Sequence, residues 1–243
     1  MKIITIDNLY LEMIHPAHSQ DIFRLIDSNR DHLGKWFQWI NRQQNINDTR
    51  NLIEACIQQY HEGLGVTFCM VFNKRLAGLI SYYGIDKDKQ TLKIGYWLGK
   101  AFEGYGLVSK SCMTLLAILF NIGDFKLVTL ACRMDNLKSC SVAERLNFKI
   151  TRFGIEPRDL PHSYIYYNMD INQWNTLYHY QFWTINSILH SSISLRLPSI
   201  NELKIARRLS TQHAVSSLFF RKTQSSEDKT NLSDLSAISK CPR

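Results

Sequence analysis

The chain is organised around residues 94–108, Ile94-Gly95-Tyr96-Trp97-Leu98-Gly99-Lys100-Ala101-Phe102-Glu103-Gly104-Tyr105-Gly106-Leu107-Val108. The first part alternates along its length as a half-buried strand does, and the second part carries two glycines before an apolar helical pattern. Glycine lets the backbone come close to a ligand, and the first turn of a helix has N–H groups without partners inside the helix. The stretch therefore predicts a strand, a loop and a helix N-terminus that binds phosphate.

The hydrophobic periodicity on either side of this stretch predicts further strands and helices. We expect strands within residues 3–14, 66–72, 76–83, 92–98, 125–132, 148–155 and 164–171, and helices over residues 16–30, 48–60, 107–120 and 136–145. The strands at 66–72 and 76–83 form a predicted hairpin, and residues 125–132 are apolar on both faces. Hairpins mixed with strand–helix–strand units indicate an α+β fold, with a mixed, mainly antiparallel central sheet flanked by helices.

Residues 33–40 contain three aromatic side chains, Trp36, Phe37 and Trp39. Two interpretations stay open for this segment. The rings either belong to the hydrophobic core or form a wall of the substrate site.

The last 69 residues differ from the rest of the chain in composition. Residues 175–243 hold 13 serines and no glycine, and their nine Lys or Arg against four Asp or Glu supply most of the net charge of +8. We therefore expect one domain over residues 1–174 and a basic, Ser-rich C-terminal extension over 175–243, with a basic amphipathic helix at 201–222 and disorder at 223–243. The extension either binds an acidic partner or has no role.

The overall composition is that of a soluble globular protein, with 45% hydrophobic and 21% charged residues. No uninterrupted apolar run reaches about 18 residues, so we expect no membrane span. Asp7 comes too early for a signal peptide. The six cysteines are scattered and no histidines cluster, which favours reduced, buried thiols over metal sites or disulfides. Together these features predict a cytoplasmic protein without a metal.

Two common phosphate-binding motifs do not fit the glycine loop. The third glycine of the dinucleotide fingerprint is missing, and so is the Gly-Lys-Ser/Thr of a P-loop. A second segment follows about thirty residues later, Asn136-Leu137-Lys138-Ser139-Cys140-Ser141-Val142-Ala143-Glu144-Arg145-Leu146-Asn147-Phe148. The two segments, in this order and at this distance, resemble the GNAT acetyltransferases, and among them the RimJ/RimL type, which acetylates the N-terminal amine of ribosomal proteins. The resemblance covers residues 1–174.

The resemblance implies that the chain uses acetyl-CoA as co-substrate. Its pyrophosphate would be held by the backbone amides of Gly104, Tyr105, Gly106, Leu107 and Val108. Ser139 would also contact the cofactor, and Asn136 would contact it, cap the helix that follows, or do both.

Four positions depart from the family pattern: Lys93 stands where an acid is common, Val108 where Gly or Ala is common, and Glu103 and Asn147 are the other two. Glu103 stands where the family usually has Gln or Arg, and its charge does not favour a pyrophosphate. Asn147 replaces a glycine, a mild change because Asn tolerates left-handed backbone angles.

The resemblance also implies candidate catalytic groups. The backbone N–H near Leu98 would donate to the thioester carbonyl, and Ser139 would protonate the departing thiolate, unless it is only a helix-capping serine. Glu156 would act as a base through water, or it is a surface charge. Tyr164, Tyr166 and Tyr167 either shape the substrate site or pack the sheet. Nothing indicates a covalent acyl-enzyme.

These expectations favour an N-acetyltransferase (EC 2.3.1 type) that moves acetyl directly from acetyl-CoA to a primary amine. The N-terminal α-amine of a protein, such as a ribosomal protein, is the preferred acceptor. A small amine such as a polyamine or an aminoglycoside is the first alternative, although residues 1–174 show no acidic cluster. The second alternative is a degenerate, non-catalytic module that binds acetyl-CoA. Binding to the ribosome and formation of a homodimer stay open.

Overall fold

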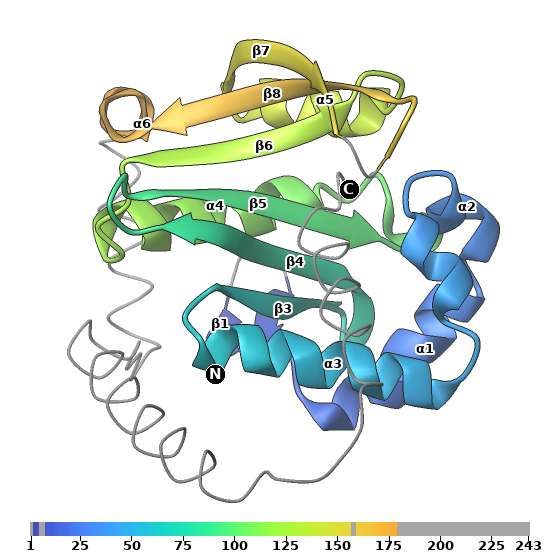
Figure 1. Ribbon diagram of the computed structural model, residues 1–243. Helices are drawn as coiled ribbons and strands as arrows, with labels where there is room; N and C mark the ends of the chain where they lie inside the picture. Colours follow the sequence, from blue (N-terminus) through green and yellow to red (C-terminus); the bar gives the residue numbers. More distant parts are fainter. Residues whose placement is uncertain (1, 5–7, 157–158, 179–243) are drawn as a thin grey trace, which may run out of the picture.

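The computed structural model describes residues 2–4, 8–156 and 159–178. Its centre is an eight-stranded sheet in the order β1-β2-β3-β4-β5-β6-β8-β7 (Figure 1). The strands are β1 (Lys2–Ile4), β2 (Leu9–Met13), β3 (Gly65–Phe72), β4 (Arg75–Asp86), β5 (Thr91–Leu98), β6 (Leu127–Arg133), β7 (Lys149–Ile155) and β8 (Ser163–Asp170). Among these strands only the β5–β6 pair is parallel, which confirms the predicted mixed, mainly antiparallel sheet.

Helices cover both faces of the sheet, with α3 in front and α4 behind in the view of Figure 1. The helices are η1 (Pro16–His18), α1 (Ser19–Asp27), α2 (Arg30–Gly34), η2 (Gln38–Arg42), α3 (Ile46–His61), η3 (Lys100–Phe102), α4 (Leu107–Asn121), α5 (Leu137–Arg145) and α6 (Ile171–Tyr178). Strand alternation divides the buried side chains between two cores. Tyr96 belongs to the core that α4 and α5 cover, and its neighbour Trp97 to the core that α1, α2 and α3 cover.

Local sequence explains two of the connections. The β3–β4 hairpin turns through Asn73 and Lys74, whose φ angles of 49° and 63° indicate the type I′ turn that suits a two-residue hairpin. Helix α3 begins at Ile46, two residues before the predicted start at Asp48. The reason is a capping box, in which Asn45 accepts from the Asp48 N–H and Asp48 accepts from the Asn45 N–H.

The helix predicted over residues 16–30 is divided into η1, α1 and the separate helix α2. The break lies at Ser28 and Asn29, and the Asn29 side-chain amide donates to the Leu25 carbonyl at 2.8 Å. Such side-chain bonds compete with the helical hydrogen-bond ladder. The division lets α2 take its own direction at the end of β5.

The C-terminal part of the described chain packs on the sheet. In α6, Trp174 and Tyr178 are buried, and the Tyr178 hydroxyl donates to the Leu146 carbonyl at 3.1 Å. The boundary expected near Trp174 thus falls inside this helix. The helix expected at 201–222 and the disorder expected at 223–243 lie outside the described residues.

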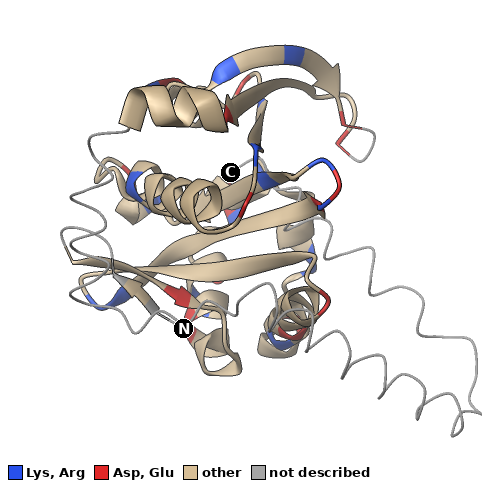
Figure 2. Cartoon of the chain, turned by 90° about the vertical axis from the view of Figure 1, so that its left-hand side faces the viewer, with Lys and Arg blue, Asp and Glu red and all other residues tan. Residues whose placement is uncertain are grey.

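Charges of both signs are interspersed over the described chain (Figure 2). None of the helices in this part is long and apolar enough to cross a membrane. Five cysteines fall within it, all buried and outside any disulfide: Cys56, Cys69, Cys112, Cys132 and Cys140. Burial raises the pKa of the Cys56 thiol to about 11. Cys241 lies outside the described residues.

Candidate functional site

The sheet opens where β5 and β6 end. These strands pair from Thr91–Leu127 to Ile94–Leu130, and there the register stops, although β5 continues to Leu98 and β6 to Arg133. Figure 1 shows the two strands side by side at one end and spread apart at the other. We call this opening the β5–β6 separation. The facing strand edges within it are no longer paired with each other and can accept the amide groups of a ligand.

The Leu98 N–H points into the β5–β6 separation. The next N–H, that of Gly99, donates to the Ala77 carbonyl at 2.8 Å on the β4 side. Successive N–H groups of a strand point to opposite edges, so the Leu98 N–H faces the β6 side, beyond the last β5–β6 pair. This orientation suits the carbonyl-binding role expected from the sequence.

The glycine loop leads from this strand end to α4. Gly104 and Gly106 have φ angles of +86° and +70°, which side chains other than glycine rarely adopt. A Cβ at Gly104 would meet nothing within 4 Å, and one at Gly106 only the end of the Lys110 side chain at 4.0 Å, so this side of the loop is open.

Gly106 is also the N-cap of α4, and no side-chain cap bond forms there. The first helical bond runs from the Lys110 N–H to the Gly106 carbonyl at 3.0 Å. The N–H groups of Leu107, Val108 and Ser109 come before it and have no acceptor within the helix. With no acidic residue in its first turn, the α4 N-terminus can bind an anion.

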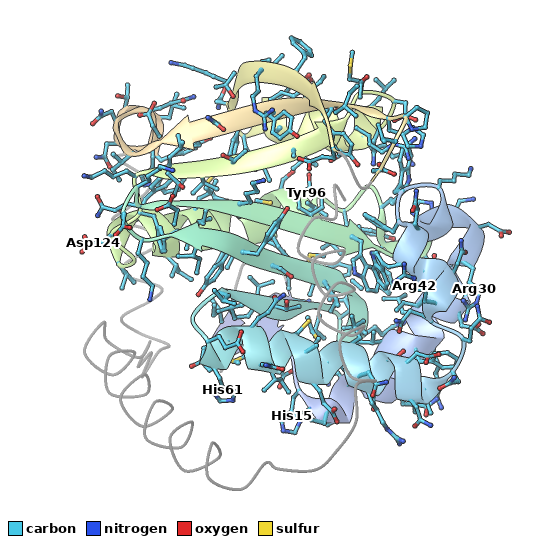
Figure 3. The ribbon with its side chains drawn as sticks, viewed as in Figure 1. His15, Arg30, Arg42, His61, Tyr96 and Asp124 are labelled. Atoms are coloured by element: carbon cyan, nitrogen blue, oxygen red, sulfur yellow. The ribbon has the colours of Figure 1, made fainter. Side chains whose placement is uncertain are left out.

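Ser139 lies in the first turn of α5 and contacts β5. Its hydroxyl is 3.1 Å from the Tyr96 hydroxyl, and both residues are at least 95% buried. Tyr96 lies on the part of β5 that no longer pairs with β6 (Figure 3). The N-cap of α5 is Asn136, whose side chain accepts from the Ser139 N–H at 3.3 Å. The capping role proposed for Ser139 is therefore wrong, because Asn136 holds that position, and Tyr96 is a site residue that the sequence did not reveal.

The Glu103 carboxylate contacts two other elements. One carboxylate oxygen pairs with Lys138 Nζ on α5, and the other lies 3.3 Å from His32 Nε2 on α2. Burial lowers the pKa of His32 below 6.5, against the opposing effect of the Glu103 charge. No local pattern in the sequence pointed to either partner of Glu103.

Glu156 follows β7 and accepts a hydrogen bond from the Tyr166 hydroxyl on β8. Burial, followed by this bond to Glu156, raises the pKa of Tyr166 to about 12. The Arg152 guanidinium lies 3.4 Å from the centre of the Tyr166 ring. Tyr164 donates in the same way to Asp159. The loop after β7 is thus tied to β8 by tyrosine–carboxylate pairs.

Arg133, at the end of β6, joins this region to the aromatic segment 33–40. It is 6% exposed, forms a two-point ion pair with Asp135, and donates to the Lys35 carbonyl at 3.0 Å. Its guanidinium also lies 5.2 Å from the centre of the Trp36 ring. The hydrogen bonds from Arg133 lower the pKa of the Asp135 carboxyl. Sequence reasoning missed Arg133.

The aromatic segment divides between the two interpretations. Phe37 and Trp39 are buried in the core that α1, α2 and α3 cover, whereas Trp36 is half-buried against Arg133. Of the three closing tyrosines, Tyr167 points to the opposite face of β8 and reaches Glu144 on α5 at 3.4 Å. Tyr167 therefore packs the sheet against α5, and Tyr164 and Tyr166 face the loop after β7.

The predicted site residues thus come from four places in the fold. The loop residues 104–108, the strand end at Leu98 and the α5 residues Asn136 and Ser139 border the β5–β6 separation, while Glu156 lies at the end of β7 and contacts Tyr166 on β8. No cluster of three or more His, Cys, Asp or Glu side chains able to hold a metal occurs in the described part of the chain.

Comparisons with known proteins agree with this geometry. Residues 8–149, more than half of the chain, match the family model described as the acetyltransferase (GNAT) domain. A protein of Bacillus subtilis, provisionally named ribosomal N-acetyltransferase YdaF, is 26% identical over 172 residues, which are 69% of this chain and 94% of that protein. The ribosomal-protein-serine acetyltransferase of Escherichia coli is 28% identical over 142 residues, 58% of this chain and 79% of that one.

Solved structures share the fold. The structure of RimL, a ribosomal L7/L12 α-N-protein acetyltransferase in complex with coenzyme A, superposes with a TM-score of 0.68 at 24% identity, covering 71% of this chain and 99% of that one. The acetyltransferase MccE, in complex with acetyl-CoA and AMP, superposes with a TM-score of 0.65 at 24% identity, covering 68% and 93%. At these identities the structural likeness carries the fold alone.

Proposed function

Since the chain belongs to the GNAT acetyltransferase family, we propose that it transfers an acetyl group from acetyl-CoA to the N-terminal α-amine of a protein. One observation carries the proposal. The β5–β6 separation lies directly beside the glycine loop and the open α4 N-terminus, so one elongated ligand with amide groups and a pyrophosphate can contact both.

In this proposal the cofactor is bound mainly by the main chain. The N–H groups of residues 104–108 donate to the pyrophosphate, and the positive φ angles of Gly104 and Gly106 let the backbone approach it. The amide groups of the pantetheine arm pair with the strand edges of the β5–β6 separation. The free energy of binding then depends on backbone shape more than on side-chain identity.

The acetyl transfer is direct. The amine nitrogen attacks the thioester carbon, and the developing negative charge on oxygen is stabilised by the Leu98 N–H. The C–S bond then breaks, and Ser139 gives its proton to the thiolate. The attacking nitrogen loses a proton as the amide forms, and this proton restores the Ser139 hydroxyl through Tyr96, whose hydroxyl oxygen is 3.1 Å from that of Ser139.

The attacking amine must first lose a proton. A protein α-amine has a pKa of about 7.7–8.0, so a modest base is sufficient. We assign this role to Glu156, acting through a water molecule. Its bond from the Tyr166 hydroxyl fixes the carboxylate at the end of β7.

Two features favour a protein N-terminus over a small polycation. The carboxylates of Asp135, Glu156 and Asp159 are each bonded to a neighbouring side chain, and that of Glu103 is paired with Lys138. They therefore form no open acidic patch for a polyamine or an aminoglycoside. Relatives named as ribosomal acetyltransferases also support a protein acceptor.

The test is a thiol-release assay with acetyl-CoA and a panel of acceptors. The panel holds peptides with free N-termini that begin with Ser, Ala or Met, the same peptides with blocked N-termini, spermidine and an aminoglycoside. We expect thiol release, and a mass increase of one acetyl group, only with free N-terminal peptides. Turnover of spermidine alone would favour the small-amine alternative. Binding of acetyl-CoA without any turnover would leave a non-catalytic binding module.

A further inference from the structure

The two side chains that contact the Glu103 carboxylate lie on helices from distant parts of the chain. Lys138 belongs to the first turn of α5, which follows β6. His32 belongs to α2, which lies between β2 and β3 in the chain. Each carboxylate oxygen has its own partner. Glu103 itself is 27% exposed at its side chain, whereas Lys138 is 76% exposed. The charge is therefore oriented toward the two helices.

Helix α2 is fixed to the end of β5 from its other side. The Asn29 side chain accepts from the Lys100 N–H at 2.9 Å. A Cβ at Gly99 would come within 2.7 Å of the end of the Leu25 side chain on α1, so this side chain would have to shift for any other residue. With α2 at the end of β5 and α5 at the end of β6, Glu103 links the two sides of the β5–β6 separation.

The charges around His32 explain why this link needs a carboxylate. Within the described chain the Glu103 carboxylate raises the pKa of the imidazole, and three cations lower it: Lys35, which directly follows α2, Lys100 of η3 and Lys138 of α5. Without Glu103 the three lysine charges around His32 would lose the carboxylate that offsets them. Repulsion would then favour a wider distance between α2 and α5.

We propose that Glu103 is a positioning residue for the acceptor, because its carboxylate holds α2 against α5 and so fixes the path by which the amine reaches the thioester. The inference rests on the proposed function and deepens it. It also gives Glu103 a role on the acceptor side, apart from the pyrophosphate. Loss of the carboxylate then weakens acceptor binding and leaves cofactor binding intact.

The test compares Glu103→Gln, Lys138→Gln and the double variant with the wild type. We expect the acceptor KM to rise about two- to fivefold in each, as for a partly exposed ion pair, with kcat little changed and the double variant no worse than either single one. The affinity for acetyl-CoA, measured by calorimetry, should stay within about twofold of the wild type. Hydrogen exchange should become faster in residues 30–34.

The matched control is Asp86→Asn. It removes one carboxylate from an ion pair with Lys89 (3.1 Å) at the β4–β5 turn, far from α2 along the sheet, and should change none of these quantities. Tighter acetyl-CoA binding with an unchanged acceptor KM would place Glu103 on the cofactor side and overturn the proposal. Unchanged KM and unchanged exchange would make the pair an idle surface contact. If no acceptor is acetylated at all, the proposed function fails, while the exchange of residues 30–34 still reports on the link.

Discussion

The cofactor half of the site, residues 104–108 with Leu98, offers mainly main-chain N–H groups, and its side chains can vary. We assign to the acceptor half the side chains of Arg133, Glu156 and Tyr166, which come from β6, the end of β7 and β8. In the first region the backbone angles determine where the hydrogen-bond donors point. In the second region side-chain packing and strand register determine which groups meet.

This difference predicts how each half responds to substitution. A main-chain site is damaged by changes that alter φ angles or fill the space beside the backbone, and it tolerates other changes. A side-chain site loses one interaction at a time, so single substitutions should have graded effects. The following variants test the contrast, from the largest expected effect to the smallest.

Gly106→Glu should weaken acetyl-CoA binding most. The φ of +70° strains any other residue, and the new carboxylate would enter the space that the anion needs. If two hydrogen bonds to the pyrophosphate are lost, at about 2 kcal/mol each, the affinity should fall about 1,000-fold in calorimetry.

The control for this variant is Gly84→Glu. Gly84 also has a positive φ, +61°, with nothing within 4 Å of a built Cβ, but it lies near the end of β4 at the β4–β5 turn. The Gly84→Glu variant introduces the same backbone strain and the same charge at a position outside the loop, so acetyl-CoA binding should be unchanged. Wild-type affinity in Gly106→Glu would show that the α4 N-terminus is not the anion site.

Ser139→Ala should lower kcat about 100-fold, because the thiolate then leaves without a proton donor. The affinity for acetyl-CoA should stay the same. Ser141→Ala is the matched control, since Ser141 lies on the same helix and only donates to the Leu137 carbonyl at 2.8 Å. Full turnover in Ser139→Ala would assign the proton donation to another group, with Tyr96→Phe as the next variant to measure.

The cofactor half could be predicted from the sequence because its signal is local. Two glycines before an apolar helix specify the loop, and Asn136 three residues before Ser139 specifies the cap. The left-handed backbone expected at Asn147 is also present, with φ of +59°. Each of these features depends on a few adjacent residues.

The rest of the site depends on contacts between distant residues. Arg133 reaches the Lys35 carbonyl across 98 positions, and the Tyr96 and Ser139 hydroxyls meet across 43. Such pairs follow from strand register and helix docking, which hydrophobic periodicity does not determine. The same reason explains why the sequence left the roles of Trp36 and Glu103 open.

Glu156→Gln should reduce kcat/KM about tenfold at pH 7, where most of the α-amine still carries a proton. The loss should shrink above pH 8, because the amine then deprotonates without help. Glu144→Gln is the control, since Glu144 accepts from the Tyr167 hydroxyl on the opposite face of β8. A loss that is independent of pH would indicate that Glu156 acts by holding the loop after β7 and not as a base.

The smallest expected effect is a change in the pKa of His32, the α2 residue that contacts Glu103. Burial holds this pKa below 6.5, while Glu103 raises it and Lys138 lowers it. Folded His32 therefore binds a proton less readily than the unfolded chain does, and its contribution to stability is lost as pH falls below 6.5.

Glu103→Gln should lower the pKa of His32 further, and Lys138→Gln should raise it, as measured by NMR titration of the imidazole carbon-bound protons. Since α2 and α5 lie on the two sides of the β5–β6 separation, opposite shifts would show that Glu103 and Lys138 act on one imidazole in solution. Shifts of the same sign, or none in both variants, would mean that these two charges do not both act on His32.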